Sequence, residues 1–229
     1  LDASTEDGLV WRVDLRLRPE GSLGAIANSL PAAERYYETF GRLWERAALL
    51  RARPSAGDLA LGREMLDMLL PFVYVRHVDP TVAVEMIRLV ERSRAELSSD
   101  PELDLELGRG GIREAEFFVQ SLQLVWGGRD PRLRVPGMLD ALRRLRARGL
   151  VTDREGREIA DAYLLLRRLE HRVQWSSGIQ THLLPKPGET RARLARSMGY
   201  RGEAELERDL DRARARIAKM QSRGQWGAR

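Results

Sequence analysis

Amphipathic helical segments separated by prolines and glycines fill the chain after residue 24, and this pattern constrains the fold more than any other feature. Apolar residues recur there every three to four positions, the spacing that gives a helix one apolar face. Prolines mark boundaries, because a proline fits the first turn of a helix and interrupts its interior. The predicted helices cover residues 31–50 as a single helix, 57–70, 80–97, 112–126, 137–148, 153–176, 189–198 and 203–221. Short connections between the later helices favour an antiparallel bundle.

The size and composition of the chain narrow its class. Its 229 residues suffice for one large domain or two small ones, and a hydrophobic content of 43% can supply a core. No apolar run approaches the ~20 residues of a membrane helix, and no secretory leader is visible. The absence of cysteine excludes disulfides, cysteine-based metal sites and a thiol nucleophile. We therefore expect a soluble, cytoplasmic protein that has no contact with a membrane.

A polar segment at residues 98–101 precedes a short alternating stretch at residues 103–107, which ends in a glycine-rich turn at residues 108–111. We expect a short extended piece there and place a domain boundary beside it. The predicted domains are residues 1–100 and residues 101–229.

The segment from residue 9 to residue 18 alternates between apolar and charged side chains, as a strand with one core face does. Leu9, Trp11, Val13, Leu15 and Leu17 share one face, while Arg12, Asp14, Arg16 and Arg18 share the other. A carboxylate among guanidinium groups is typical of sites that handle a metal and phosphates together. A solvated outer face is the alternative. Because a lone strand leaves its backbone groups unpaired, we expect it to pair with residues 1–6 or with a sheet elsewhere in a longer protein, of which this chain is a fragment.

A second unusual segment begins at Gly110-Gly111 and continues into the predicted helix 112–126. Glycines let a backbone or a phosphate approach closely, and the free N–H groups of a helix start attract anions. At helical spacing Arg113, Glu116, Gln120 and Gln123 form a polar stripe. A helix start with a purely structural role is the alternative interpretation.

A third segment, residues 41–53, places Glu45 three residues after Arg42 and beside Arg46 on a predicted helix. A surface ion pair is available there, and such pairs contribute only ~0.3 to 0.5 kcal/mol.

Several common sites are absent from the sequence. The three histidines, His77, His171 and His182, lack metal-ligand spacing, and neither a phosphate-binding glycine loop nor a nucleophile elbow occurs. The arginine-rich stretches at residues 143–148 and 212–216 alternate around helices that also carry acids. We interpret them as solvated faces and expect no binding of nucleic acid.

These segments together resemble the glutamine synthetase adenylyltransferase/adenylyl-removing enzyme family. The resembling residues are 12–21, Tyr36-Tyr37, 44–46, 50–53, 110–114, Glu116-Phe117, Val119-Gln120, 163–170 and 198–200. The resemblance implies a mostly α (α+β) fold, in which a truncated polymerase-beta-like nucleotidyltransferase domain with few strands is followed by an antiparallel helical bundle. The forms of residues 16–21 and 111–114 look more like the amino-terminal, adenylyl-removing half. That half removes AMP from a tyrosine of glutamine synthetase by Mg²⁺-dependent phosphorolysis that releases ADP.

The resemblance also implies a site. Asp14 matches the third carboxylate of a two-Mg²⁺ site, whose other ligands we expect upstream of this chain, so the chain alone is predicted to be inactive. Further matching residues are Arg16 and Arg18 for phosphate, Glu45, Arg46, Arg51 and Arg53 for the nucleotide or adenylylated tyrosine, and Gly110, Gly111, Arg113, Glu114 and Glu116 for the helix start of the second domain. The implied partners are glutamine synthetase, the PII signal protein, ATP or ADP, and phosphate.

Two other readings stay open at this point. The chain could belong to the half that transfers AMP from ATP to glutamine synthetase, or to a related uridylyltransferase. It could instead be a non-catalytic helical module that docks glutamine synthetase or PII protein.

Overall fold

A computed structural model describes residues 6, 13–77, 79 and 81–222, and the side chains up to residue 220. The chain divides into two compact units, Leu1–Val73 and Tyr74–Arg229, here called the N-terminal unit and the helical unit. The domain division predicted at residues 100 and 101 falls inside the helical unit and stays a prediction.

Among its described residues, the N-terminal unit has three helices, α1 (Leu30–Thr39), α2 (Leu43–Leu49) and α3 (Leu59–Val73), which follow a 3-10 turn, η1 (Gly21–Leu23). The Ser29 hydroxyl caps α1 by accepting from the backbone N–H of Ala32, with Pro31 in the first turn. Both α1 and α2 pack against α3. Their buried side chains, which make a small core, are Ala33, Tyr37, Ala47, Leu50, Leu69 and Val73.

The expectation of one helix over residues 31–50 was wrong, because the chain breaks between α1 and α2. Gly41 lies at the break, where a Cβ would come within 2.3 Å of the Phe72 ring and 2.4 Å of the Tyr37 carbonyl oxygen. Close packing on α3 therefore interrupts a segment whose periodicity alone favours continuity.

The expectation that Pro71 closes the next helix was also wrong, since α3 continues to Val73. Its last turn is held by tertiary contacts. The Phe72 ring lies 5.1 Å from that of Tyr37, and the Val73 carbonyl accepts from the Arg46 guanidinium.

The predicted strand at residues 9–18 is not formed over its described part, because residues 13–15 have no regular secondary structure and residues 16–18 turn. Residues 9–12 lie outside the described residues. The intended core face is open to solvent there, with Leu15 49% and Leu17 58% exposed. The reason is the absence of a partner, because no neighbouring strand among the described residues supplies the hydrogen bonds that a strand needs. No polymerase-beta-like sheet is present in the described part of the chain, so the fold is all-α rather than α+β.

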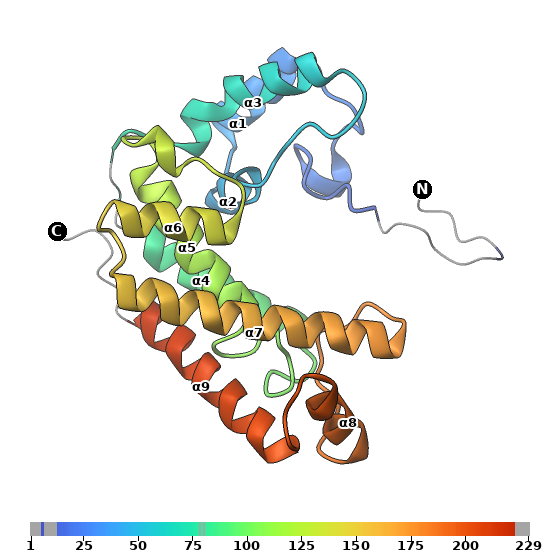
Figure 1. Cartoon of the computed structure of the whole chain (residues 1–229). Helices are drawn as coiled ribbons and strands as arrows, with labels where there is room; N and C mark the ends of the chain where they lie inside the picture. The colour runs from blue at the N-terminus through green and yellow to red at the C-terminus, as the bar shows by residue number, and fades with distance from the viewer. Residues whose placement is uncertain (1–5, 7–12, 78, 80, 223–229) are drawn as a thin grey trace. The chain divides into compact units, whose positions relative to one another are not determined.

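The described part of the helical unit contains six helices, each of which was predicted from the sequence. They are α4 (Thr81–Leu97), α5 (Ile112–Trp126), α6 (Met138–Ala147), α7 (Asp153–Ser177), α8 (Glu189–Ser197) and α9 (Glu203–Ser222), with a 3-10 turn, η2 (Pro131–Leu133). Helices α7 and α9 lie side by side and run in opposite directions (Figure 1). Helix α5 packs against α4, α6, α7 and α9, so it is the central helix of this unit.

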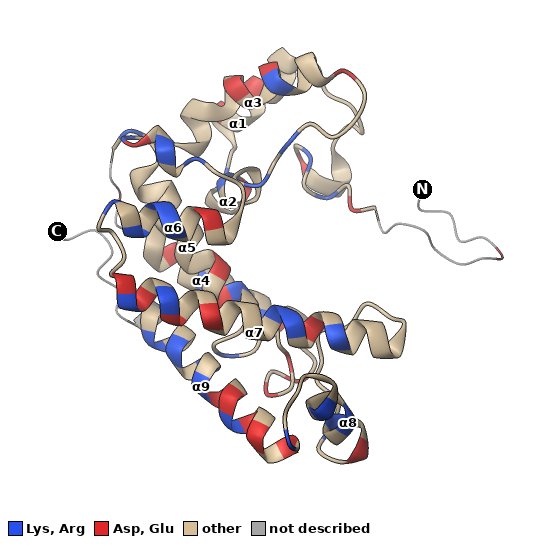
Figure 2. Ribbon diagram, viewed as in Figure 1, with Lys and Arg blue, Asp and Glu red and all other residues tan. Residues whose placement is uncertain are grey.

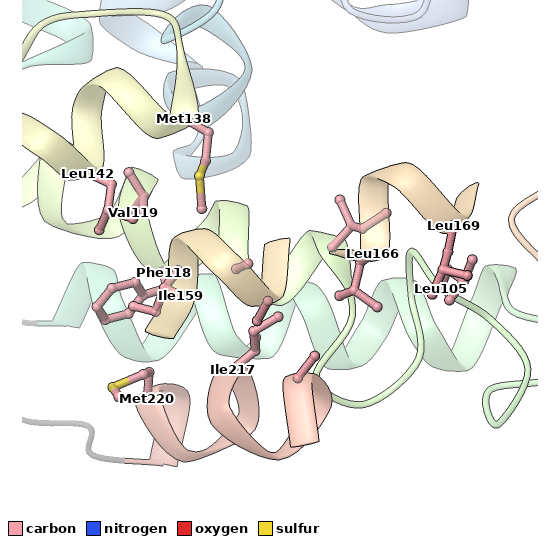
Figure 3. Close-up of a cluster of buried hydrophobic side chains, with 14 of the residues drawn as sticks. Leu105, Phe118, Val119, Met138, Leu142, Ile159, Leu166, Leu169, Ile217 and Met220 are labelled. Atoms are coloured by element: carbon pink, nitrogen blue, oxygen red, sulfur yellow. The ribbon is translucent and has the colours of Figure 1, made fainter. Parts of the chain in front are cut away.

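The core of the helical unit forms around α5, of which twelve of fifteen residues are buried. Side chains from α5, α6, α7 and α9 meet there, as Figure 3 shows for Phe118, Leu142, Leu166 and Ile217. Completely buried leucines contribute roughly 1.5–3 kcal/mol each relative to exposure. The helix predicted at residues 153–176 therefore has one apolar face in this core, as the spacing of its apolar residues predicts.

The extended piece predicted at residues 103–107 is reduced to one antiparallel bridge between Asp104 and Leu183. The carboxylate of Asp104 accepts from the backbone N–H groups of Glu106 and Leu107, which folds the segment into turns instead of a strand. No helix within the described residues is both long and apolar enough to cross a membrane.

Candidate functional site

The charged group predicted at the start of the chain is a local ion pair on the surface of the N-terminal unit. The Asp14 carboxylate accepts from the Arg16 guanidinium, with 2.7 Å between Oδ2 and Nη2. The hydrogen bond raises the pKa of the Arg16 guanidinium. Arg18 is placed differently, because it donates to the carbonyl groups of Leu15 and Gly24 and so holds the turn that follows. Asp14 and Arg16 are thus the exposed members of this group.

Glu45 is buried instead of lying at the surface, with 2% of its area exposed. Its carboxylate accepts from the Tyr36 hydroxyl at 3.0 Å and from the backbone N–H of Arg42 at 2.8 Å. The second bond caps the start of α2. The surface ion pair expected for Glu45 is therefore replaced by a buried structural role.

The three arginines predicted near Glu45 separate into two kinds. The Arg46 guanidinium donates to the carbonyl oxygen of Val73, which ties α2 to the end of α3. Arg51 and Arg53 follow α2 and are exposed. Arg46 thus has a structural contact within the unit, whereas Arg51 and Arg53 lie at its surface.

The residues around Asp14 do not by themselves fit a Mg²⁺ site. Mg²⁺ prefers an octahedral shell of oxygen ligands and is usually held by more than one carboxylate or phosphate group. Asp14 offers one carboxylate, already paired with Arg16, and no described group of three potential ligands includes it.

Gly110 allows a close approach of α9, whereas Gly111 allows one of its own turn, where a Cβ would lie 2.6 Å from the carbonyl oxygen of Glu106. Gly110 has φ +68°, and a Cβ placed on it would lie 2.1 Å from the carbonyl oxygen of Arg214. The Arg214 guanidinium donates to the carbonyl groups of Glu102 and Asp104 in the same segment. The sequence allowed either a backbone or a phosphate to approach the glycine pair closely, and in the structure a backbone does so.

Glu114 and Glu116 point into the helical unit and are buried. Glu114 is paired with the Arg94 guanidinium, which also donates from Nε to the Leu107 carbonyl at 2.7 Å. Burial raises the pKa of the Glu114 carboxyl, and the Arg94 cation opposes that rise. Glu116 accepts from the Tyr163 hydroxyl of α7 at 3.2 Å. Both acids thus lock α5 to its neighbours.

Arg113 belongs to a cluster of charged side chains that the spacing of residues in the sequence did not indicate. It is paired with Glu106, whose other oxygen lies 3.0 Å from Nδ1 of His182. Glu170 of α7 lies 3.6 Å from the same nitrogen and 2.8 Å from Arg167. Nothing in the sequence could have indicated this cluster, because its members come from three distant segments.

The ligand atoms of Glu106, Glu170 and His182 lie within 4.8 Å of one another, the arrangement in the described residues that could hold a metal ion. Two arginines already balance the two carboxylates, since Arg113 pairs with Glu106 and Arg167 with Glu170. The cluster is therefore complete in charge without a cation.

The basic stretches at residues 143–148 and 212–216 lie on helices, interspersed with acids (Figure 2). Asp140 pairs with Arg143 and Arg144, Asp153 with Arg146, and Asp209 with Arg212. These ion pairs support the interpretation of solvated, charge-balanced faces.

Comparison with known proteins gives two family matches that together span most of the chain. The family described as GlnD PII-uridylyltransferase matches residues 84–223, which is more than half of the chain. The family described as Glutamate-ammonia ligase adenylyltransferase matches residues 1–68.

Individual relatives carry the name bifunctional glutamine synthetase adenylyltransferase/adenylyl-removing enzyme. The protein from Rhodopseudomonas palustris (strain TIE-1) is 44% identical over 209 residues, 89% of this chain and 21% of the relative. That from Hahella chejuensis is 44% identical over 218 residues, 93% of this chain and 22% of the relative. That from Stenotrophomonas maltophilia (strain R551-3) is 46% identical over 202 residues, 87% of this chain and 22% of the relative.

The chain thus spans about a fifth of the length of these relatives. It belongs to the GlnD PII-uridylyltransferase family over residues 84–223, and over most of its length it is homologous to part of the bifunctional glutamine synthetase adenylyltransferase/adenylyl-removing enzymes.

Proposed function

We propose that this chain is part of the adenylyl-removing half of a bifunctional glutamine synthetase adenylyltransferase/adenylyl-removing enzyme. The observation that carries the proposal is the 44% identity to enzymes of that name over nine-tenths of the chain. The choice of half rests on the forms of residues 16–21 and 111–114, which look more like the adenylyl-removing half. In this proposal AMP leaves a tyrosine of glutamine synthetase by phosphorolysis, and PII protein regulates the reaction.

The exposed pair Asp14 and Arg16 is where we propose that the chain contacts the reacting groups. A carboxylate paired with a guanidinium keeps both charges ordered on the surface. On binding, Asp14 would exchange its bond to Arg16 for one coordination position of Mg²⁺, with the remaining ligands outside the described residues, while Arg16 turns to a phosphate oxygen. A planar guanidinium can bind phosphate through two parallel N–H groups, which suits this task.

The other predicted residues take supporting roles in the proposal. Arg51 and Arg53 are exposed and can reach an anion, whereas Glu45 and Arg46 position α2 through their bonds within the N-terminal unit. Arg18 stabilises the turn after Asp14 by donating hydrogen bonds to backbone carbonyl groups. Glu114 and Glu116 fix the helix start of α5.

Substitution of Asp14→Asn in the full-length enzyme tests the proposal. The matched control is Glu38→Gln, which removes one exposed acid from α1 of the same unit. ADP release from adenylylated glutamine synthetase is measured with phosphate and Mg²⁺, and AMP incorporation from ATP is measured in parallel. We expect Asp14→Asn to lower ADP release at least 100-fold, about 2.7 kcal/mol of activation free energy, with incorporation of AMP unchanged.

The two assays separate the alternatives. Loss of AMP incorporation with intact ADP release would assign the chain to the adenylylating half. Retention of both activities would exclude a catalytic role for Asp14 and favour the docking-module reading.

A further inference from the structure

The C-terminal end of α7 carries large apolar side chains that the rest of the helical unit leaves uncovered. Val173 is the last buried residue of the helix, and beyond it Trp175 is 85% exposed and Ile179 64% exposed. The other described tryptophans are less exposed, with Trp44 at 36% and Trp126 half-buried. A single exposed leucine needs no explanation, whereas a projecting tryptophan beside an isoleucine marks an interaction site.

The local backbone holds these side chains in a defined position. Gly178 ends α7 in the left-handed conformation, with φ +68°, and its N–H donates to the Gln174 carbonyl. The Gln174 side chain donates to the Thr181 carbonyl and so closes the loop that follows. Trp175 therefore projects from an ordered framework, which lowers the entropy cost of binding.

A pocket of about 780 Å³ adjoins Trp175 and Ile179. The basic side chains of Arg168, His171 and Arg172 line it, and no acidic residue does. We call this surface, defined by Arg168, Arg172, Trp175, Ile179 and Met198, the α7 tip.

Among the described residues no ion pair neutralises the charge of the α7 tip, although Asp161 and Asp209 line a neighbouring pocket together with Arg168. Arg168 and Arg172 have no ion pair within the described residues, in contrast to Arg143, Arg146 and Arg212 on the other helix faces. The sequence accounts for the difference. Residues 171–202 contain six Arg or Lys residues and one acid, Glu189. Of the six, Arg191 is paired with Glu203 and Glu207 of α9. No acid lies between Arg172 and the end of α7 at Ser177.

We propose that the α7 tip is a docking surface for an acidic protein segment that carries an apolar or aromatic side chain. The apolar side chain would enter the pocket beside Trp175 and Ile179, and flanking carboxylates would pair with Arg168 and Arg172. Tryptophan, arginine and methionine are the residue types enriched at the energetic centres of protein interfaces.

A protein segment fits this surface better than a nucleic acid does. Single-stranded nucleic acids are held along grooves by several aromatic platforms. The α7 tip offers one exposed indole ring beside a pocket of about 780 Å³, which has room for an apolar side chain together with its neighbours in a peptide.

Peptide binding to the full chain tests the proposal by fluorescence anisotropy. The probes are labelled 12-residue peptides with Asp and Glu around a central Phe, a second set with Ser in place of Phe, a third with Lys in place of the acids, and a single-stranded oligothymidine. The variants are Trp175→Ala and Arg172→Glu. Matched controls on the same helix are Leu164→Ala, at a side chain 41% exposed, and Arg157→Glu, at an exposed arginine.

We expect the acidic Phe peptides to bind best, and both α7-tip variants to weaken this binding at least tenfold. The controls should stay within twofold of the parent chain, and all variants should keep the parent's circular dichroism spectrum, because the altered side chains lie at the surface. Three results would overturn the proposal: no binding of the acidic Phe peptides, equal losses in the controls, or preferential binding of oligothymidine that depends on Trp175 and Arg172.

Discussion

Replacement of Arg94 by leucine tests how the helical unit tolerates a buried carboxylate at the start of α5. Glu114 has 4% of its side chain exposed and Arg94 has 22%. Removal of the cation leaves the carboxylate without its charge partner, which costs about 3–5 kcal/mol for a buried pair. The lower end applies, because Arg94 is in part solvated and because a backbone N–H of Gly110 still bonds Glu114. The lost hydrogen bond to Leu107 adds about 1 kcal/mol. We expect a total loss of about 4 kcal/mol.

The loss should depend on pH in a defined direction. Burial already raises the pKa of Glu114 in the folded chain, and removal of Arg94 raises that pKa further because the opposing cation is gone. The folded variant then binds a proton more tightly than the unfolded one. Its stability is therefore highest below the ordinary carboxyl pKa and falls as the pH rises through the raised folded pKa.

The assay is urea unfolding followed by far-UV circular dichroism at pH 5 and pH 8. Arg94→Leu should lose more free energy of unfolding at pH 8 than at pH 5. The double variant Arg94→Leu/Glu114→Gln removes the unpaired charge, so it should recover about 2 kcal/mol and lose the added pH dependence. A loss below about 1 kcal/mol that is equal at both pH values would refute the reasoning.

Two further predictions concern the helix starts. Gly110→Ala should lower the free energy of unfolding by about 3 kcal/mol or more, because a Cβ at positive φ costs about 1–2 kcal/mol and because α9 must also move. The control is Gly149→Ala, at φ +69° with open space around it, which should lose only the about 1–2 kcal/mol of the backbone conformation. Urea unfolding compares them, and equal losses would contradict the role given to α9. Glu45→Ala should cost about 2 kcal/mol, because it leaves the Tyr36 hydroxyl and the Arg42 N–H without their buried acceptor. Tyr36→Phe, which removes only one of these two bonds, should cost about half as much, as measured by thermal unfolding. An unchanged Tm for Glu45→Ala would contradict the structural role and support the ligand-contacting role predicted from the sequence.

Helix existence and most helix boundaries follow from local signals in the sequence. Helices α5, α6, α7, α8 and α9 begin and end within one residue of the predicted positions. Apolar spacing, capping residues and glycine C-caps act within a few residues of each other, so they can be evaluated without the rest of the fold. The family resemblance found in the sequence is likewise supported by the relatives.

The candidate site was predicted as a set of residues, and the structure distinguished their roles. Asp14, Arg16, Arg51 and Arg53 are exposed, whereas Glu45, Glu114 and Glu116 are buried. Burial depends on which segments pack together, so the same residue type can be a surface ligand or a structural anchor. The cluster of Glu106, Glu170 and His182 shows this most clearly, because its parts are separated by up to 76 positions and no local pattern joins them.

By itself the sequence determined that this chain is mostly helical, where its helices lie in the helical unit, and which family it resembles, because those properties depend on periodicity, capping and motif. Only the tertiary structure decided that residues 31–50 form two helices, since the break at Gly41 depends on contact with Phe72. It also decided that residues 13–18 turn instead of forming a strand, and that Gly110 admits the backbone of α9. A strand needs a partner and a close approach needs a neighbour, and neither is encoded in the segment that depends on it.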